Sequence, residues 1–322
     1  MDFSVIIVSW NAKNYLSECL QSLNKYSSKY DAEIIVVDNA STDGSPSMVQ
    51  EQFPRVKLII NENNYGFAKG NNLGINQSSG KYIFLINPDV IVKDECIEKM
   101  MAYMDVHPDI GILGPKILDP CGNTQRSCME FPSLWNTFYS AFGLHIILGK
   151  FRFFGGQMMT YWPHNSIRQV DVINGCFWMI RKEALNKVGL LDERFFMYSE
   201  DKDWCKRFYE TGWKVIFFPD AEAIHYGGAS SSNSPIRFYI EMQKANLQYW
   251  KKHYSRCACN AHLFLIFLHH MFRVLGYISV YLISKRNRNQ SAFKIRRSYT
   301  TIQWFIGKTI GKNINKWDDN LL

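Results

Sequence analysis

The sequence lacks several features that mark secreted or disulfide-bonded proteins. Its first residues, MDFSVIIVSW, contain neither the basic stretch nor the long apolar core of a secretory signal. The eight cysteines are scattered, and the one close pair, Cys257 and Cys259, has no second pair at zinc-ribbon spacing. We therefore expect reduced thiols in the cytosol and no structural zinc site.

Internal repeats, low-complexity tracts and the common glycine-rich fingerprints are also missing. The stretch NNYGFAKGNNLG has neither the GxGxxG spacing of dinucleotide-binding proteins nor the spacing of a Walker loop. A nucleotidyltransferase would normally show a glycine-rich basic loop near its N-terminus, and VSWNAKNYL is not one. A nucleotide site, if present, must be built in another way.

Positive charge is concentrated at the C-terminal end. The chain carries a net +8, but from Glu241 onward 14 Lys/Arg stand against 3 Asp/Glu, a net +11, which leaves 23 against 26, or −3, for residues 1–240. Such asymmetry favours contact with an anionic membrane or nucleic acid. The basic stretch has no recognisable nucleic-acid-reading module, so we expect no nucleic-acid partner.

Short apolar runs alternate with helical patterns in the first part of the chain. Residues 3–10, 33–38, 56–60 and 81–87 are nearly continuous and rich in β-branched residues, as expected of strands buried on both faces. Residues 12–25, 45–52 and 67–77 between them have helical patterns. This order predicts an α/β fold with a mainly parallel central sheet and ligands at the carboxyl ends of the strands.

Polar residues follow each of these strands. The donors and acceptors at the strand ends are Ser9, Asn11, Asp38, Asn39, Asn87 and Asp89. The stretch 61–74 adds Lys69 and Asn71, and its glycines at 66, 70 and 74 are expected to let the backbone approach a ligand. Singly, each is an ordinary loop composition, and Asp38 fits a turn-forming cap equally well.

The acidic stretch FFMYSEDKDWCKRF, residues 195–208, has two interpretations. At 3.6 residues per turn Asp201 shares a stripe with buried-type residues such as Trp204, whereas Asp203 points elsewhere. An inward carboxylate needs a partner, because an unpaired buried charge is costly. The alternative is a solvated first helical turn with Ser199 as the N-cap.

Seven stretches, in order, resemble one family: VSWN, VDNASTDGS, NNYGFAKGNNLGI, LINPDV, INGCFWMIRKEAL, GLLDERFFMYSEDKDWCKR and AIHYGGAS. The chain resembles the inverting glycosyltransferases of family 2, which have the GT-A nucleotide-binding fold, and specifically their rhamnosyltransferase-like branch. The resemblance covers about residues 3 to 250. It implies a GT-A domain over residues 1–255, followed by a basic, hydrophobic helical region over 256–322.

The resemblance implies a donor site and a metal site. Asp38 would contact the nucleotide, the loop from Gly66 to Asn72 would pass alongside the nucleotide-sugar, and Asp89 would end the family's DxD metal motif. Asn87 replaces the first carboxylate of that motif, so donor phosphates would complete the shell of a Mg²⁺ or Mn²⁺ ion. His225 matches a histidine near the metal, although a lone histidine is also often structural. The remaining donor-site residues implied are Ser9, Asn11, Asn39, Lys69 and Asn71.

It also implies an acceptor site around the acidic stretch. Asp201 would be the catalytic base. Glu200 would orient the acceptor, and Asp203 would serve as a helix cap or in a salt bridge. The aromatic residues expected to pack the cleft and shape the sugar site are Trp178, Phe195, Phe196 and Trp204.

The function expected is transfer of a sugar, rhamnose from dTDP-rhamnose as the best match, to a saccharide or lipid-linked saccharide acceptor in cell-surface polysaccharide synthesis. The alternative is a non-catalytic nucleotide-sugar-binding or assembly protein of the same fold. The acceptor, linkage and oligomeric state stay open.

The apolar stretch 261–284 is as long as a membrane-spanning helix, but Arg273 near its middle would be expensive in lipid. We favour a helix at the membrane interface, on the cytoplasmic face, assisted by the six basic residues of 285–297. The alternative is a hydrophobic helix packed on the catalytic domain or in a homo-oligomer.

Overall fold

The computed structural model describes residues 1–24, 26, 29–227 and 235–309, and the chain forms two compact units. Unit 1 consists of Met1–Phe131 and Gly156–Ser232, and unit 2 consists of Pro132–Gly155 and Asn233–Leu322. This division differs from the boundary expected at residue 255. Unit 2 begins earlier, and it includes a segment from the middle of the sequence.

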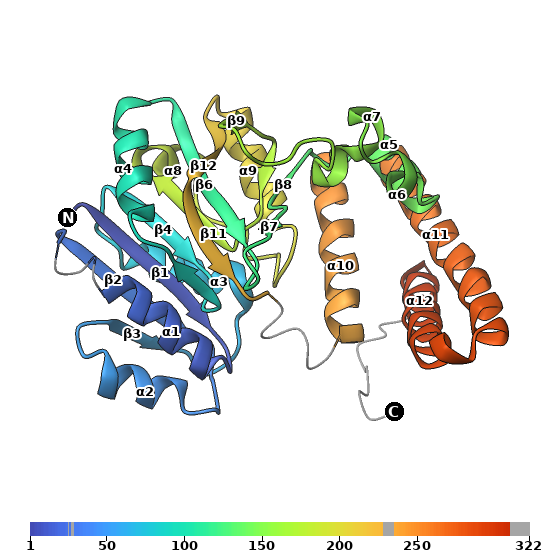
Figure 1. The fold of residues 1–322 in the computed structure, drawn as a ribbon, viewed down its shortest axis with the longest axis horizontal. Coiled ribbons are helices and arrows are strands. Elements are labelled where there is room, and N and C mark those ends of the chain that lie inside the picture. The colour runs from blue at the N-terminus through green and yellow to red at the C-terminus, as the bar shows by residue number, and fades with distance from the viewer. Residues whose placement is uncertain (25, 27–28, 228–234, 310–322) are drawn as a thin grey trace. The chain divides into compact units, whose positions relative to one another are not determined.

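Unit 1 is built on one large mixed sheet with the strand order β3-β2-β1-β4-β11-β6-β12-β5 (Figure 1). Strands β1, β2, β3, β4, β6 and β12 share one direction, whereas β11 is antiparallel to both its neighbours. β7 pairs with β6, β9 pairs with β12, and β8 and β10 form a separate two-stranded sheet. The α/β fold with a mainly parallel sheet is therefore confirmed.

The strands of unit 1 are β1 (Phe3–Ser9), β2 (Ala32–Asp38), β3 (Lys57–Ile60), β4 (Tyr82–Ile86), β5 (Val90–Val92), β6 (Ile110–Leu118), β7 (Thr124–Gln125), β8 (Cys128–Met129), β9 (Arg168–Gln169), β10 (Val172–Ile173), β11 (Phe177–Arg181) and β12 (Lys214–His225). Its helices are α1 (Lys13–Asn24), α2 (Ser45–Gln52), α3 (Gly66–Asn76), α4 (Cys96–Val106), η1 (Gly156–Met158), α8 (Lys182–Val188) and α9 (Glu200–Glu210).

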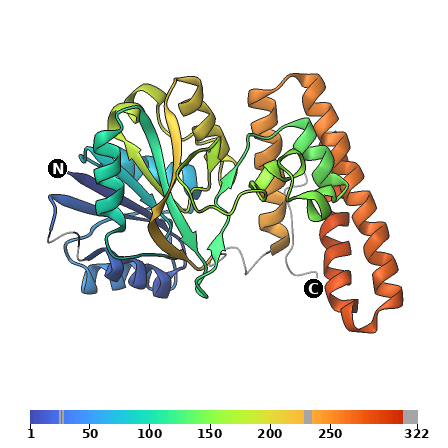
Figure 2. The same cartoon turned by 45° about the horizontal axis from the view of Figure 1, so that its top comes forward.

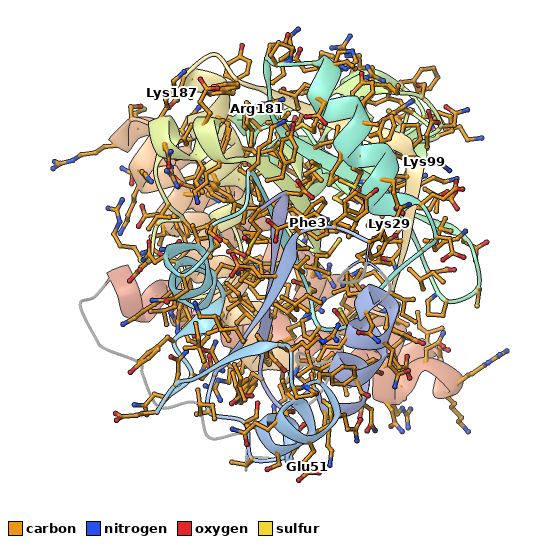
Figure 3. All side chains as sticks on the ribbon, turned by 90° about the vertical axis from the view of Figure 1, so that its left-hand side faces the viewer. Phe3, Lys29, Glu51, Lys99, Arg181 and Lys187 are labelled. Atoms are coloured by element: carbon orange, nitrogen blue, oxygen red, sulfur yellow. The ribbon has the colours of Figure 1, made fainter. Side chains whose placement is uncertain are left out.

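The continuous apolar runs arise because the sheet is covered on both faces. Along β1, Val5 and Ile7 belong to the core that includes α1, α2 and α4, while Ile6 belongs to the core that includes α3, α8 and α9. Alternate side chains of a strand point to opposite faces, so both faces demand apolar residues. Figure 3 shows Phe3 inside this packing and Lys187 at the edge.

The glycines of α3 have a packing role. A Cβ placed on Gly70 would lie 2.7 Å from a methyl carbon of Val8, and one on Gly74 would lie 2.4 Å from a methyl carbon of Ile6. The helix therefore approaches β1 too closely for any side chain at these positions. The close approach expected toward a ligand is, at Gly70 and Gly74, an approach to the sheet.

Unit 2 is helical, as expected of the C-terminal appendage. It contains α5 (Leu134–Ala141), α6 (Leu144–Leu148), α7 (Arg152–Gly155), α10 (Pro235–His253), α11 (Arg256–Ile283), η2 (Lys285–Asn287) and α12 (Arg288–Thr309). α11 lies beside α12 in both ribbon views (Figures 1 and 2). Residues 310–322 of the expected region lie outside the described residues.

A small apolar cluster joins the long helices of unit 2. Ile240 and Leu247 of α10 are buried against Trp304 and Phe305 of α12. Cutting the chain at residue 255 would therefore expose the apolar face of α10. In the described part of the chain, α11 is the one helix long and apolar enough to cross a membrane by length and composition.

Candidate active site

The ends of β1 and β2 present two unsatisfied oxygens. Ser9 and Asp38 are partners in the parallel ladder, so their side chains stand at the same sheet edge. One Asp38 oxygen accepts the Ser41 backbone N–H at 2.8 Å, which satisfies the turn-forming interpretation. The other oxygen and the Ser9 hydroxyl are buried without a partner among the described residues. Buried polar atoms are rarely left so, and a bound ligand would satisfy them.

Neighbouring asparagines hold the loops of this edge in place. The Asn39 side chain donates to the Gly66 carbonyl at 3.1 Å and accepts from the Asn61 amide at 2.9 Å. The Asn11 side chain accepts the Thr42 backbone N–H at 2.8 Å. Asn39 and Asn11 therefore fix the loops through protein contacts.

The two other residues predicted to bind the nucleotide-sugar donor, Lys69 and Asn71, lie on α3. The Asn71 side chain donates to the Phe67 carbonyl at 2.9 Å, one turn earlier in the same helix. The Lys69 ammonium lies 4.1 Å from the centre of the Tyr65 ring. Both residues lie in the first half of α3, whose N-terminal backbone N–H groups favour anions.

The first turn of α3 touches the loop that leads into the acidic helix. The Phe67 N–H donates to the Phe196 carbonyl at 2.7 Å. Gly66 has a φ of +82°, and a Cβ placed on it would lie 2.2 Å from the same carbonyl oxygen. Glycine is required here for both reasons. The predicted donor loop is thus joined directly to the segment before Glu200.

Asp89 and His225 form a pair at the same edge. Asp89 is buried, and one of its oxygens lies 3.4 Å from Nε2 of His225. The Gln125 side chain donates to the His225 carbonyl at 2.6 Å, and its Oε1 lies 3.1 Å from His225 Nδ1. Because Oε1 can only accept, Nδ1 carries a proton, and Nε2 is the ring nitrogen that faces Asp89. Gln125 was not predicted, since an isolated Gln in a two-residue strand gives no sequence signal.

The acidic helix α9 begins after an unusual turn. Tyr198 and Ser199 both have positive φ angles, 71° and 61°, which non-glycine residues rarely adopt. Ser199 occupies the N-cap position as predicted, and its carbonyl accepts the Asp203 backbone N–H at 3.0 Å, but its side chain makes no capping hydrogen bond. Two consecutive residues in this region mark local strain of the kind that gathers at functional sites.

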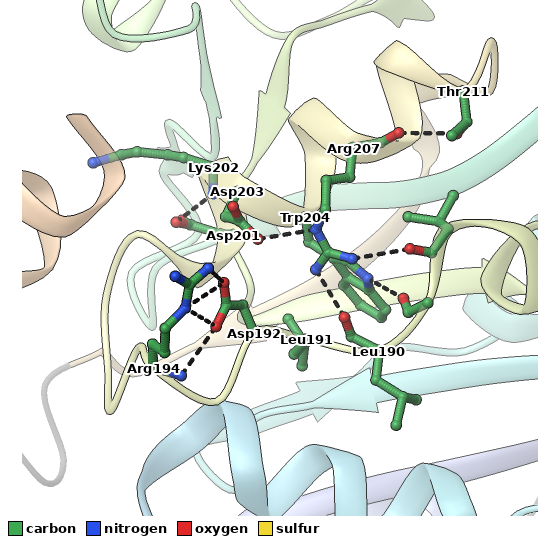
Figure 4. Close-up of polar contacts among 12 residues, drawn as sticks. Leu190, Leu191, Asp192, Arg194, Asp201, Lys202, Asp203, Trp204, Arg207 and Thr211 are labelled. Carbon is green, nitrogen blue, oxygen red and sulfur yellow. Dashed lines mark hydrogen bonds and ion pairs between the residues drawn. The ribbon is translucent and has the colours of Figure 1, made fainter. Parts of the chain in front are cut away.

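The three carboxylates of α9 differ in burial. Asp203 is fully buried and forms an ion pair with Arg207 Nε at 3.0 Å, so the expected salt bridge is present (Figure 4). Asp201 is half-buried and accepts the Lys202 backbone N–H at 2.8 Å. The prediction that Asp203 points away from the core was wrong. Glu200 is buried, and one of its oxygens has no partner among the described residues.

Cys176 links the acidic helix to the Asp89 pair. Its carbonyl accepts the Asn87 backbone N–H at 2.9 Å, which ties the segment before β11 to the end of β4. Burial first, and then the negative charge of Asp89 with a smaller contribution from Asp201, raise the pKa of the Cys176 thiol to about 12. Both carboxylates thus lie within electrostatic reach of one thiol.

Burial changes the protonation of the Glu200 and Asp201 pair. Burial first, and then the Asp201 charge, raise the pKa of Glu200 to about 8. Burial also raises the pKa of Asp201. Because two adjacent carboxylates in a poorly solvated place resist ionising together, we expect Glu200 to keep its proton at neutral pH while Asp201 ionises.

This pair makes stability depend on pH. Between the ordinary value of 4.5 and about 8, folded Glu200 holds a proton that the unfolded chain releases, so stability falls as pH rises through this window. We expect Glu200→Gln to raise the melting temperature by several degrees above pH 8 and by less near pH 5. The exposed Glu210→Gln on the same helix is the control. A gain independent of pH would show that Glu200 ionises normally.

The aromatic residues expected to shape the sugar site are mostly core. The side chains of Trp178, Phe195 and Trp204 are buried, and Phe196 is the exposed member of the predicted set. Trp178 donates to the Ile173 carbonyl at 2.9 Å, and its ring lies 5.5 Å from that of Trp204. Trp178 therefore supports α9 through its contact with Trp204, which is the supporting alternative of its predicted role.

Asn72, like Gln125, has a structural role that was not predicted from the sequence. Its side chain accepts the Leu191 N–H at 3.1 Å and donates to the Leu191 carbonyl at 2.9 Å. These two hydrogen bonds fix α3 to the segment before α9, in addition to the contact between Gly66 and Phe196. The pairing spans 119 residues of sequence and could not be read from spacing.

The sheet order, the polar strand ends and the acidic helix at the same edge define a GT-A glycosyltransferase fold. The family model for glycosyl transferase family 2 matches residues 4–189, more than half of the chain, and the chain belongs to this family.

Two similar proteins of this family have names that state a donor sugar. The chain is 29% identical over 255 residues to N-acetylglucosaminyl-diphospho-decaprenol L-rhamnosyltransferase of Mycobacterium tuberculosis, covering 72% of this chain and 78% of that protein. It is 27% identical over 264 residues to dTDP-rhamnosyl transferase RfbF of Shigella flexneri, covering 77% and 80%.

A solved structure supports the fold. The mannosyltransferase PcManGT of Pyrobaculum calidifontis, in complex with GDP-Man and Mn²⁺, has a TM-score of 0.54 at 15% identity, over 98% of this chain and 88% of that one.

Proposed function

We propose that this protein is a metal-dependent inverting rhamnosyltransferase that uses dTDP-rhamnose and a saccharide or lipid-linked saccharide acceptor. The observation that supports the proposal is that Asp38 ends and Asp89 follows parallel strands at the same edge of the sheet, while the loop before Asp201 is hydrogen-bonded to the start of α3. Both named relatives are rhamnosyltransferases, which favours this donor. A place in cell-surface polysaccharide synthesis follows from such an acceptor.

Asp201 is proposed as the base of the reaction. An acceptor hydroxyl must lose its proton as it attacks the anomeric carbon, and Asp201 is half-buried rather than committed to a salt bridge. Protonated Glu200 beside it can donate a hydrogen bond to the acceptor and so orient it. Asp203 cannot share this role, because Arg207 already holds its carboxylate.

The residues at Asp89 fit a divalent cation. The Asp89 carboxylate is buried, and Nε2 of His225, 3.4 Å from it, can bind a metal ion when it carries no proton. Gln125 holds Nδ1 of the same ring, as outer partners of metal-bound histidines do. Within the described residues no third His, Cys, Asp or Glu completes a cluster. Mg²⁺ commonly takes one or two carboxylates with phosphates and water. The cation would neutralise charge growing on the leaving diphosphate.

The donor pocket is proposed around Ser9 and Asp38. Their two unpartnered oxygens suit the hydroxyl and N–H groups of a nucleoside. Asn11, Asn39, Gly66 and the Asn87 backbone would shape the pocket through their protein contacts. Lys69 and Asn71, near the start of α3, would stand toward the diphosphate.

We also propose peripheral binding of unit 2 to the cytoplasmic membrane. Only 6% of the most apolar 18-residue window of α11 is buried inside the protein, and the side chain of Ile283 at the end of this helix is 85% exposed. The segment of α6 and α7 adds Ile146 and Ile147, about four-fifths exposed, beside the cations of residues 150 and 152. Apolar side chains interleaved with cations suit an anionic bilayer interface.

The function is tested by incubating the purified protein with a panel of nucleotide sugars, Mg²⁺ and a polyprenyl-diphosphate saccharide. We expect release of dTDP from dTDP-rhamnose and a product one deoxyhexose heavier by mass spectrometry. Release from UDP- or GDP-sugars alone would retain the glycosyltransferase and overturn the donor. Binding of a nucleotide sugar without any turnover would favour a non-catalytic assembly role.

A further inference from the structure

The division into two units sharpens the charge asymmetry of the chain. Unit 2 contains 17 Lys/Arg against 3 Asp/Glu, a net +14, whereas unit 1 contains 20 against 26, a net −6. Among the described residues of unit 2, Glu241 is the one acidic residue, and it pairs with Lys244 at 2.5 Å. Positive charge therefore greatly exceeds negative charge among the described residues of this unit.

Three of these cations converge on two tyrosine rings. Arg273 of α11 lies 5.3 Å from the centre of the Tyr277 ring, and Lys294 of α12 lies 5.0 Å from it. The Arg297 guanidinium lies 4.4 Å from the centre of the Tyr239 ring on α10. Burial raises the pKa of Tyr239, and the positive charges of Arg297 and Arg273 oppose that shift, so both arginines lie close to it.

The arrangement is costly without an anion. The Nε atoms of Arg273 and Arg297 and the Nδ1 atom of His270 are buried without a hydrogen-bond partner among the described residues. His270 faces the Tyr239 hydroxyl through Nε2 at 3.5 Å. Like charges in one partly buried place repel, and a buried charged donor without a hydrogen-bond partner is destabilising. Stacking on tyrosine satisfies neither requirement.

We propose that Arg273, Arg297 and Lys294 form a binding site for a phosphate group on unit 2. A phosphate oxygen accepts from an arginine fork in two parallel bonds, which would use the free Nε donors. The site also accounts for an arginine in the middle of an apolar helix. Arg273 and Lys294 of α12 both lie close to the Tyr277 ring, where a phosphate could neutralise them. This inference does not depend on the transfer reaction proposed above.

The test uses the full chain and three double variants. Arg273→Gln with Arg297→Gln removes the site, and Lys285→Gln with Arg286→Gln, exposed residues of η2, removes equal charge elsewhere. Arg273→Lys with Arg297→Lys keeps the charge but loses the fork, and it supplies the result if the glutamine pair fails to fold. Each protein is melted with and without inorganic pyrophosphate and is sedimented with phosphatidylcholine vesicles, with or without phosphatidylglycerol.

We expect the glutamine and lysine pairs to bind pyrophosphate or anionic vesicles more weakly by about tenfold for each arginine. The η2 pair should keep its pyrophosphate binding and lose only the part of vesicle binding that two surface cations supply. A response to vesicles alone identifies a lipid headgroup, and a response to pyrophosphate alone identifies a soluble phosphate. Equal losses in the arginine and η2 variants would reduce the site to general charge attraction. No response of the wild-type protein to either probe would overturn the proposal.

Discussion

Replacing Asp201 by asparagine is expected to reduce turnover by about 10²- to 10⁴-fold while donor affinity stays within about twofold. The change removes a proton acceptor but keeps shape and the hydrogen bond from the Lys202 backbone N–H. An interaction used only in the chemical step should lower kcat and kcat/KM together. Steady-state kinetics and calorimetric titration of dTDP measure the two quantities separately.

The pH dependence of kcat gives a second test of Asp201 as the base. Because burial raises the pKa of Asp201 above the ordinary 3.8, the acidic limb of the wild-type kcat profile should lie above that value. The limb should disappear from the residual activity of the variant. Glu210→Gln, an exposed carboxylate at the other end of α9, is the matched control and should keep full turnover. Undiminished turnover in Asp201→Asn would remove this residue as the base.

The parallel half of the fold was predictable because its signal is local. The runs at 3–10, 33–38, 56–60 and 81–87 are apolar at successive positions, and the structure places β1 to β4 there. β1, β2 and β4 are covered on both faces, whereas the edge strand β3 is partly exposed, so the burial predicted for 56–60 was wrong. Strand direction is a long-range property. β11 runs antiparallel in the middle of the sheet, and nothing in FWMIR encodes that.

The acidic helix shows where periodicity alone misleads. A helical wheel placed Asp201 inward and Asp203 outward, yet the buried face of α9 is broad and includes Glu200 and Asp203 as well as Trp204. Asp203 tolerates burial because Arg207, one turn later, pairs with it. Helical periodicity predicts which way each side chain points. Whether a charged side chain can be buried depends on an ion-pair or hydrogen-bond partner, which periodicity does not reveal.

Unit 2 was the least predictable part. Residues 132–155 lie between strands of unit 1 in the sequence but join the C-terminal helices. Their connection is made by contacts such as that of Phe142 with Phe272, ring centres 5.7 Å apart, and of Thr137 with His262, 3.1 Å apart. Side-chain pairs separated by more than 120 residues leave no trace in composition or spacing.

Removing the cation or its carboxylate should have the other large effect. We expect excess EDTA to abolish turnover and Mg²⁺ or Mn²⁺ to restore it. Asp89→Ala should leave activity below detection and remove the metal dependence of donor binding, because Asp89 is the one carboxylate of the NPD sequence. Calorimetric titration of Mn²⁺ in the presence of dTDP measures the loss directly, apart from any effect on catalysis.

Replacing Gln125 should cause a smaller loss of metal affinity than replacing Asp89. Gln125 touches His225 through both its amide atoms but not Asp89, so Gln125→Leu would release the imidazole without removing a ligand. Outer partners of metal-bound histidines are typically worth about 10–100-fold in metal affinity, so this variant should fall between the wild-type protein and Asp89→Ala. Thr124→Ser, at the exposed neighbouring position of β7, is the control. Full wild-type activity in EDTA, with Gln125→Leu unaffected, would show that protein groups such as Lys69 stabilise the leaving diphosphate instead.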